Sequence, residues 1–420
     1  MKRYIAAGLA AVLLCGTCAP AYAADVQSGA AEDAAEEEQT GPVRLSFDTL
    51  EETVRENNLS IKSYENTIKS AEETDVDDNY QESLADIEIQ IWNYQRQISQ
   101  LDEAIRNLGN DDNAAALRKS LEAQRASLQT ALARLEASYD DTENQRDDAE
   151  ADQPKVIEST RREMQNAANE ICVSAENNYI SLQTLQYSVN ETARSLAQLD
   201  RSIAVTEKQV EIGLAGENTL KNLQSQRETL LANQQSLNTQ MENLTNTLAL
   251  QCGYALGTEL ETEALPAITQ EQLDALDYEA DLQEALDNSY SIWSKEYAVE
   301  TASDDYADGV TNNLHAFDAA KIDRDAEIEN VTASFRQLYK DIQEKQAALT
   351  AAQANLAQAQ KTYDVQELQY RLGIISQIEY MNAQDTLAAA EESAASAEID
   401  LFTAYQTYQW ARRGVMSSAA

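Results

Sequence analysis

The chain contains the same two patterns twice, and this repetition is the strongest constraint on its fold. Residues 209–220 align without a gap with residues 369–380, at an offset of 160. An earlier pair of segments, 54–63 and 285–294, aligns at an offset of 231. Two markers that recur in one order indicate an internal duplication. Because the second offset exceeds the first by 71, the first copy carries an insert of about that many residues between its markers.

The insert, residues 76–150, is expected to form an antiparallel helical hairpin. Its first part has apolar residues at alternating steps of three and four, which is the heptad pattern of packed helices. The segment 109–112 then breaks the pattern, and a second apolar series follows. The first series is Leu84, Ile87, Ile91, Tyr94, Ile98, Leu101, Ile105 and Leu108, and the second is Leu117, Leu121, Leu128, Leu132, Leu135 and Tyr139.

Few residues break helices, since only 12 Gly and 4 Pro occur in 420 residues. We therefore predict an all-α fold of duplicated long antiparallel helical hairpins, a coiled-coil bundle with little or no β-barrel. We expect Ser46 to cap the first helix and Pro154 to lie in the first turn of the helix after the insert. The predicted parts are a signal peptide (1–23), an acidic flexible leader (24–43), a first repeat (44–260) that holds the insert, a connector (261–274), a second repeat (275–412) and a C-terminal tail (413–420).

The first residues have the pattern of an export signal. Lys2 and Arg3 precede an apolar stretch, and Ala21-Tyr22-Ala23 is a small-residue cleavage site. A lipoprotein signal at Cys15 or Cys18 is the alternative, although the residues before these cysteines are not the small ones such a signal uses. No later stretch reaches the roughly 20 apolar residues of a membrane-spanning helix.

The charge balance argues against one class of partner. The chain has 31 basic and 73 acidic residues, and removal of Lys2 and Arg3 with the signal would leave a net charge of −44. A polyanionic surface repels nucleic acid, so we expect no nucleic-acid partner.

Two segments resemble the signatures of a known family. The segment 45–58, LSFDTLEETVRENN, resembles the opening motif of TolC-family outer-membrane efflux proteins. The segment 370–376, YRLGIIS, with Ile378, Tyr380 and Ala383-Gln384 after it, is similar to the second motif of that family. Both motifs occur in both halves, with Val210 in place of the tyrosine in the first. The resemblance covers roughly residues 44–75, 155–255 and 275–412.

The resemblance implies a TolC-like α-helical body in which each repeat contributes long helices. It implies a homotrimer that closes a helical duct, with a membrane-fusion adaptor and an inner-membrane pump as partners. The two glycine turns would be the hairpin tips that meet the adaptor. The residues carried over to these tips are Gly213, Leu214, Arg371, Leu372, Gly373, Ile374 and Ser376.

The function that follows is an exported efflux or secretion duct component. The alternative is a non-transporting coiled-coil scaffold of the cell envelope. The resemblance implies an outer-membrane location, and the cell wall of a single-membrane bacterium is the alternative.

The remaining candidate residues give little sign of chemistry. Cys172 and Cys252 are either two buried thiols on helices or a disulfide, since the chain carries an export signal. The segment 304–315 superficially resembles a calcium loop, but Tyr306 and His315 occupy positions where oxygen ligands are needed. No motif of a phosphate loop, nucleophile or histidine dyad occurs, so we predict no enzyme activity, no cofactor and no metal site.

Overall fold

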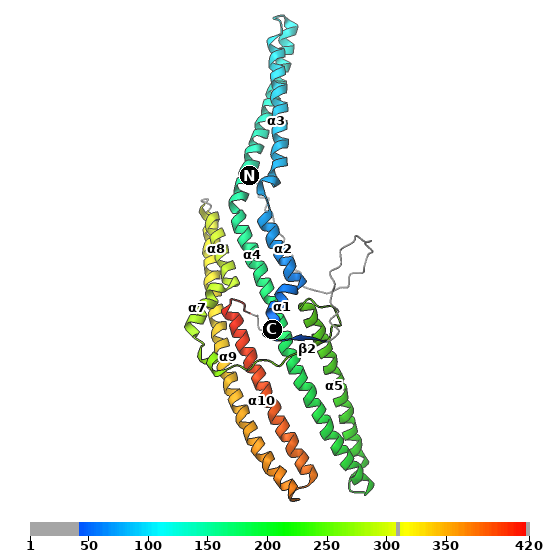
Figure 1. The fold of residues 1–420 in the computed structure, drawn as a ribbon. Helices are drawn as coiled ribbons and strands as arrows, with labels where there is room; N and C mark the ends of the chain where they lie inside the picture. The colour runs from blue at the N-terminus through cyan, green and yellow to red at the C-terminus, as the bar shows by residue number, and fades with distance from the viewer. Residues whose placement is uncertain (1–41, 308–310, 417–420) are drawn as a thin grey trace. The chain divides into compact units, whose positions relative to one another are not determined.

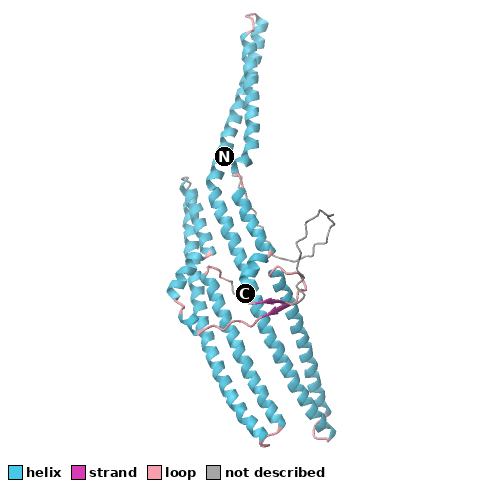
Figure 2. Ribbon diagram, in the orientation of Figure 1, coloured by secondary structure: helices cyan, strands magenta, loops and turns pink. Residues whose placement is uncertain are grey.

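A computed structural model describes residues 42–307 and 311–416, and these residues are almost entirely helical (Figure 1, Figure 2). The all-α prediction is confirmed. The predicted export signal, nearly all of the acidic leader and the last four residues of the tail lie outside the described residues.

The helices follow the predicted duplication. The first repeat contains α1 (Leu50–Asn57), α2 (Leu59–Glu73), α3 (Val76–Arg106), α4 (Asp112–Glu211) and α5 (Glu217–Gln251). The connector holds the short α6 (Gln270–Asp274), and the second repeat contains α7 (Tyr278–Asn288), α8 (Tyr290–Ala307), α9 (Thr311–Arg371) and α10 (Gln377–Arg412). Among the described residues four pairs of successive helices pack on each other: α3 on the first part of α4, α5 on its last part, α8 on the first part of α9, and α10 on its last part. Two short strands, β1 (Val43–Leu45) and β2 (Leu260–Thr262), form a parallel pair.

Each repeat begins with two helices that are separated by one non-helical residue. Between α1 and α2 the side-chain oxygen of Asn58 accepts hydrogen bonds from the amides of Ser60 and Ile61, at 2.9 and 3.2 Å. Between α7 and α8 the hydroxyl of Ser289 accepts from the amide of Ile292 at 3.3 Å. Both side chains accept hydrogen bonds from amide groups at the start of a helix. The interruption between the two helices is thus present in both repeats, with asparagine as the capping residue in the first and serine in the second.

The last helix of each repeat ends against this break. Gly253 follows α5 and Gly414 follows α10, with φ angles of 79° and 84°. A Cβ atom on Gly253 would collide with the backbone of Asn57, and one on Gly414 with the backbone of Asn288. These two asparagines are 231 residues apart, the offset of the first sequence marker. Close approach to the backbone requires glycine at both ends, so the duplicated helices are fastened to their own repeat in the same way.

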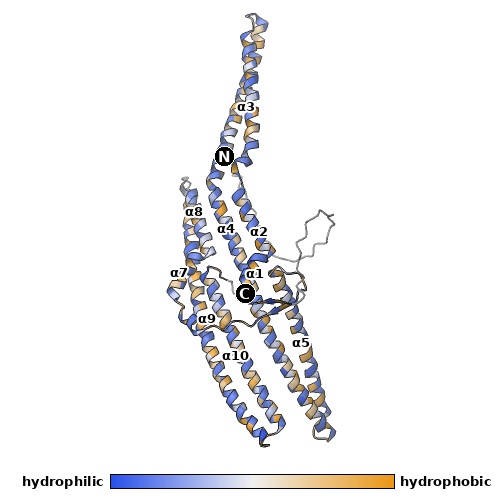
Figure 3. Cartoon of the chain, viewed as in Figure 1, coloured by the Kyte–Doolittle hydropathy of each residue, from blue (hydrophilic) through white to orange (hydrophobic). Residues whose placement is uncertain are grey.

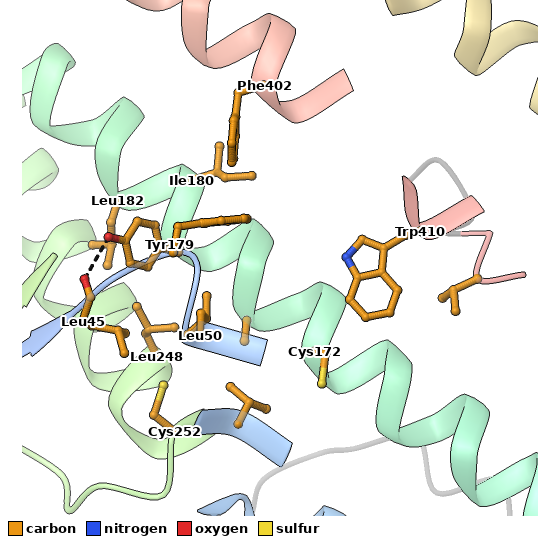
Figure 4. Close-up of a cluster of buried hydrophobic side chains, with 14 of the residues drawn as sticks. Leu45, Leu50, Cys172, Tyr179, Ile180, Leu182, Leu248, Cys252, Phe402 and Trp410 are labelled. Atoms are coloured by element: carbon orange, nitrogen blue, oxygen red, sulfur yellow. Dashed lines mark hydrogen bonds between the residues drawn. The ribbon is translucent and has the colours of Figure 1, made fainter. Parts of the chain in front are cut away.

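The main apolar core joins residues that are far apart in the sequence (Figure 4). The ring of Phe47 packs edge-on against Tyr179 and Phe402, with centroids 5.6 and 4.7 Å away. The hydroxyl of the fully buried Tyr179 lies 2.9 Å from the carbonyl oxygen of Leu45 and 2.7 Å from that of Glu263. The core thus joins α1, α4, the carboxyl end of the parallel strand pair and α10, and it brings the two repeats together.

The α3–α4 hairpin has a different kind of packing. Every apolar position of the predicted first series is half-buried, and α3 has no fully buried residue. The second series forms the predicted returning helix, and its first member, Leu117, is 50% exposed near the start of α4. Figure 3 shows apolar and polar residues interspersed along this hairpin, as expected where two helices share one narrow seam.

Two predicted helix boundaries are wrong. Pro154 lies inside α4, which continues through the end of the insert without a break. The missing amide of Pro154 leaves the carbonyl of Glu150 without its helical partner, and this exposed position is open to water. Ser46 does not cap α1, because that helix begins at Leu50, and the Ser46 hydroxyl accepts a hydrogen bond from the amide of Asp48 at 3.3 Å.

The close approach at Gly414 predicts that alanine there destabilises the protein more than alanine at a glycine with open surroundings. Gly257 has a similar φ of 86° with open space around its Cβ position, so it is the matched control. We expect Gly257→Ala to lower the free energy of unfolding by about 1 kcal/mol, the cost of the left-handed backbone alone. Gly414→Ala should cost roughly 3 kcal/mol or more, because backbone atoms must also move. Urea unfolding of both variants measures the difference, and equal midpoints would contradict the close approach.

The insert should be removable. The side chain of Gln153 on α4 donates to the carbonyl oxygen of Thr74, so the two ends of the insert lie next to each other. We expect that replacing residues 76–150 by a short Gly/Ser loop leaves the remaining helices folded, since a short flexible loop costs little entropy. Circular dichroism and continued protection of the Cys172 and Cys252 thiols measure this, and exposure of both thiols would show that the body depends on the insert.

Candidate docking surface at the hairpin tips

The two glycine turns reverse the chain in the same way. α4 ends at Glu211 before the first turn, and α9 ends at Arg371 before the second. Gly213 has a φ of 75° and Gly373 one of 70°. The amide of the residue after each glycine donates to a carbonyl five residues back: Leu214 to Gln209 at 2.7 Å, and Ile374 to Gln369 at 2.8 Å. This pattern ends helices where a glycine takes the left-handed conformation.

The tips also match in what they expose. At each of the ten aligned positions of residues 211–220 and 371–380 the two side chains are alike in being exposed or half-buried. The residues on either side of each glycine carry large apolar side chains that lie mostly in solvent. Their exposed fractions are 68% for Ile212, 77% for Leu214, 65% for Leu372 and 67% for Ile374. Exposed apolar side chains at matching positions on two turns are more informative than scattered ones, because scattered surface apolar residues are ordinary.

The second tip has an aromatic support that the first does not. The rings of Tyr370 and Tyr380 are parallel within 1°, with centroids 4.6 Å apart. The hydroxyl oxygens of Tyr363 and Tyr380 lie 2.9 Å apart, at hydrogen-bonding distance. At the corresponding positions the first repeat has Ile203, Val210 and Leu220. The second tip therefore has a ring stack and a hydroxyl pair at positions where the first repeat has aliphatic side chains.

Two polar residues that the family resemblance assigns to the tips, Ser376 and Arg371, form hydrogen bonds within the chain. Ser376 is the N-cap of α10: its hydroxyl accepts from the amide of Glu379 at 3.2 Å, and the Glu379 carboxylate accepts from the amide of Ser376 at 2.7 Å. These hydrogen bonds hold the pKa of Glu379 below its ordinary value. Arg371 donates to Glu367 at 2.5 Å on the exposed surface. Gly216 occupies the position of Ser376 in the first repeat and offers no side-chain cap.

The structure thus places the predicted tip residues at two equivalent turns. Sequence reasoning missed Ile212, although the offset of 160 from Leu372 leads to it directly. It also missed the Tyr363–Tyr380 hydroxyl pair, since Tyr363 lies outside the repeated motif and only the helix pairing brings it to Tyr380.

Polar contacts join the two hairpins above the tips. Arg194 and Arg201 on α4 form ion pairs with Glu392 and Asp385 on α10. A cavity of about 750 Å³ lies beside the second pair. Its lining is Gln198, Arg201, Ser202, Val205, Thr206, Ile378, Asn382, Asp385, Thr386 and Ala389. The facing sides of α4 and α10 therefore meet here through charge pairs and small polar side chains.

The two described cysteines are buried free thiols, so the structure contains no disulfide between Cys172 and Cys252. Figure 4 shows them at separate places in the core, with Cys172 near Trp410 on α10 and Cys252 at the end of α5. Burial raises the pKa of Cys172 to about 11 and that of Cys252 to about 12, which keeps both thiols protonated at neutral pH.

In the part of the chain that the structure describes, no group of three or more His, Cys, Asp or Glu side chains is arranged to hold a metal ion. Among residues 42–307 and 311–416, no helix combines the length and the apolar character that crossing a membrane requires.

Comparison with known proteins gave matches among solved structures only. No model of a protein family matches the chain, and no curated protein matches it. The outer-membrane protein VceC of Vibrio cholerae is 13% identical, with 88% of this chain and 97% of that chain covered and a TM-score of 0.49. CusC, described as forming a transmembrane channel, is 17% identical, with 76% and 96% covered and a TM-score of 0.48. The CmeC outer-membrane channel of Campylobacter jejuni is 12% identical, with 66% and 69% covered and a TM-score of 0.44. Each of these three proteins is one that the chain is similar to, at a TM-score below 0.5.

The tip glycines should be needed for their backbone conformation alone. A Cβ at Gly213 or Gly373 meets nothing within 4 Å, so valine there would be strained only by the positive φ. We expect Gly213→Val and Gly373→Val each to cost about 1–2 kcal/mol and to speed hydrogen exchange in the adjoining helix turns. Gly109→Val is the control, because Gly109 has equally open surroundings without a positive φ. Equal hydrogen-exchange rates in all three variants would contradict the predicted backbone strain at Gly213 and Gly373.

Proposed function

We propose that this protein is a TolC-like efflux or secretion duct component of the cell envelope. It acts as the helical body of a homotrimer and docks a membrane-fusion adaptor at its hairpin tips, and the adaptor connects it to an inner-membrane pump. There is no chemical step. The sequence motifs support the proposed class of protein, and the exposed apolar pairs at Ile212/Leu214 and Leu372/Ile374 are the observation that carries the docking role.

Two features of the tips support recognition of a protein partner. Each apolar pair is fixed on a short turn at the end of two packed helices, so little conformational freedom is lost when a partner covers it. Repetition of the pair at both tips gives one chain two equivalent contact points, and a trimer would present six. Linked contact points raise the overall affinity well above that of a single contact.

The docking role can be tested by charging the tips. We expect the double variants Ile212→Asp/Leu214→Asp and Leu372→Asp/Ile374→Asp each to reduce co-purification of the membrane-fusion adaptor roughly tenfold or more, because buried charge opposes an apolar interface. Leu256→Asp is the control, since Leu256 is 71% exposed in the loop between α5 and β2, away from both tips. Retention of the adaptor by both tip variants at the level of the control would refute docking at the tips.

A non-transporting envelope scaffold is the second candidate. The α3–α4 hairpin favours it, because an extended helix pair in which α3 buries no residue is suited to spacing rather than to enclosing a passage. Imaging of the purified particle distinguishes the two functions. A closed ring of three chains around a lumen supports the duct, and single chains or filaments support the scaffold.

A further inference from the structure

A buried carboxylate lies where the two repeats meet. Glu176 on α4 is 7% exposed, and its Oε2 atom accepts a hydrogen bond from the indole nitrogen of Trp410 on α10 at 2.8 Å. Cys172, one helical turn away, has no exposed surface. Figure 4 shows Trp410 extending from the last turn of α10 toward α4 beside Cys172. The Trp410–Glu176 hydrogen bond is therefore buried in the contact between the first repeat and the end of the second.

The charged groups around this contact come from α1 and from Arg413, the residue that follows α10. The guanidinium of Arg413 donates to both carboxylate oxygens of Glu51, at 2.9 and 2.6 Å, and lies 3.9 Å from the centroid of the Trp410 ring. Arg55 donates to Glu51 at 2.9 Å and to Asn169 at 2.6 Å. Both arginines are thus directed to Glu51, and Glu176 receives the neutral indole donor.

This arrangement makes the protonated form of Glu176 stable near neutral pH. Burial raises the pKa of Glu176 to about 7, the charge of Glu51 acts in the same direction, and Trp410, Arg413 and Arg55 oppose the rise. An exposed glutamate loses its proton near pH 4.3. Glu176 thus changes charge in the neutral range, and it does so inside the contact between the repeats.

We propose that Glu176 is a proton-operated joint between the two repeats: the contact between α4 and the end of α10 is closed when Glu176 carries a proton and loosens when it is charged. Glu176 acts here as a positioning residue for Trp410 and the last turn of α10.

The direction of the effect follows from proton linkage. Between the ordinary pKa of a glutamate and about 7, the closed joint holds a proton that the open joint releases. The closed form is therefore favoured at the acidic end of this range and loses stability as the pH rises toward 7. The Glu51–Arg413 pair behaves oppositely, since Arg413 holds the pKa of Glu51 below its ordinary value. That pair weakens only when acid protonates Glu51, outside the range in which Glu176 responds.

The two buried thiols provide an internal measurement. Cys172 lies at the joint, whereas Cys252 lies at the end of α5, and both have no exposed surface. Pulsed thiol labelling at several pH values, read by peptide mass spectrometry, gives the ratio of the two labelling rates in the same molecules. The ratio cancels the pH dependence of the reagent and of global unfolding. We expect it to rise roughly tenfold or more from pH 5.5 to 8, and to stay flat in Glu176→Gln, which keeps a hydrogen-bond acceptor without the charge.

Two further variants should move the transition in opposite directions. Trp410→Phe removes a donor that favours the charged carboxylate, so the rise in the ratio should shift to higher pH. Glu51→Gln removes a neighbouring negative charge and releases Arg413, so the rise should shift to lower pH. A flat ratio in the unaltered protein, or an unchanged rise in Glu176→Gln, would overturn the proposal. If Trp410→Phe does not fold, Glu51→Gln and Glu176→Gln decide the matter, and an unshifted rise in Glu51→Gln would also count against it.

Discussion

The apolar core around Tyr179 is the contact on which the described structure depends. Most side chains of these long helices are exposed or half-buried. Apart from a second cluster around Phe335 and Tyr408, which joins α7, α9 and α10, the fully buried ones gather where α1, α4, the end of α5 and the last turns of α10 meet. Burial of large apolar side chains contributes about 1.5–3 kcal/mol each, so this region supplies much of the stability that an extended hairpin cannot supply for itself. Phe402 and Trp410 bring the second repeat into the same core.

At the hairpin tips the helices are held together by fewer buried side chains. At the tips, backbone hydrogen bonds and a positive φ close each turn, and few side chains are covered. This leaves the apolar pairs free for a partner at little cost to the fold. The joint at Glu176 differs from the tips, because its single carboxylate is buried within the core itself, between Cys172 and Tyr179 on α4, among groups that favour different protonation states.

Several features could be read from the sequence because they depend on local order. The offset of 160 located both tip turns, and glycine at the same position in each copy is required by the left-handed backbone there. The spacing of Ile87, Ile91 and Ile98 located the insert seam, since side chains at these steps share one helix face. Pro154 was misplaced because a local rule treats proline as a helix start, while an exposed position in a long helix tolerates the lost hydrogen bond.

The sequence by itself determined the helical class, the duplication, the turn positions and the half-buried seam, because each arises from propensity and periodicity over neighbouring residues. Only the tertiary structure decided that Gly253 and Gly414 touch the backbone of Asn57 and Asn288, that Tyr363 meets Tyr380, and that Glu176 is buried against Trp410. Those contacts join residues from separate helices, and the register between packed helices depends on the whole core rather than on any one segment.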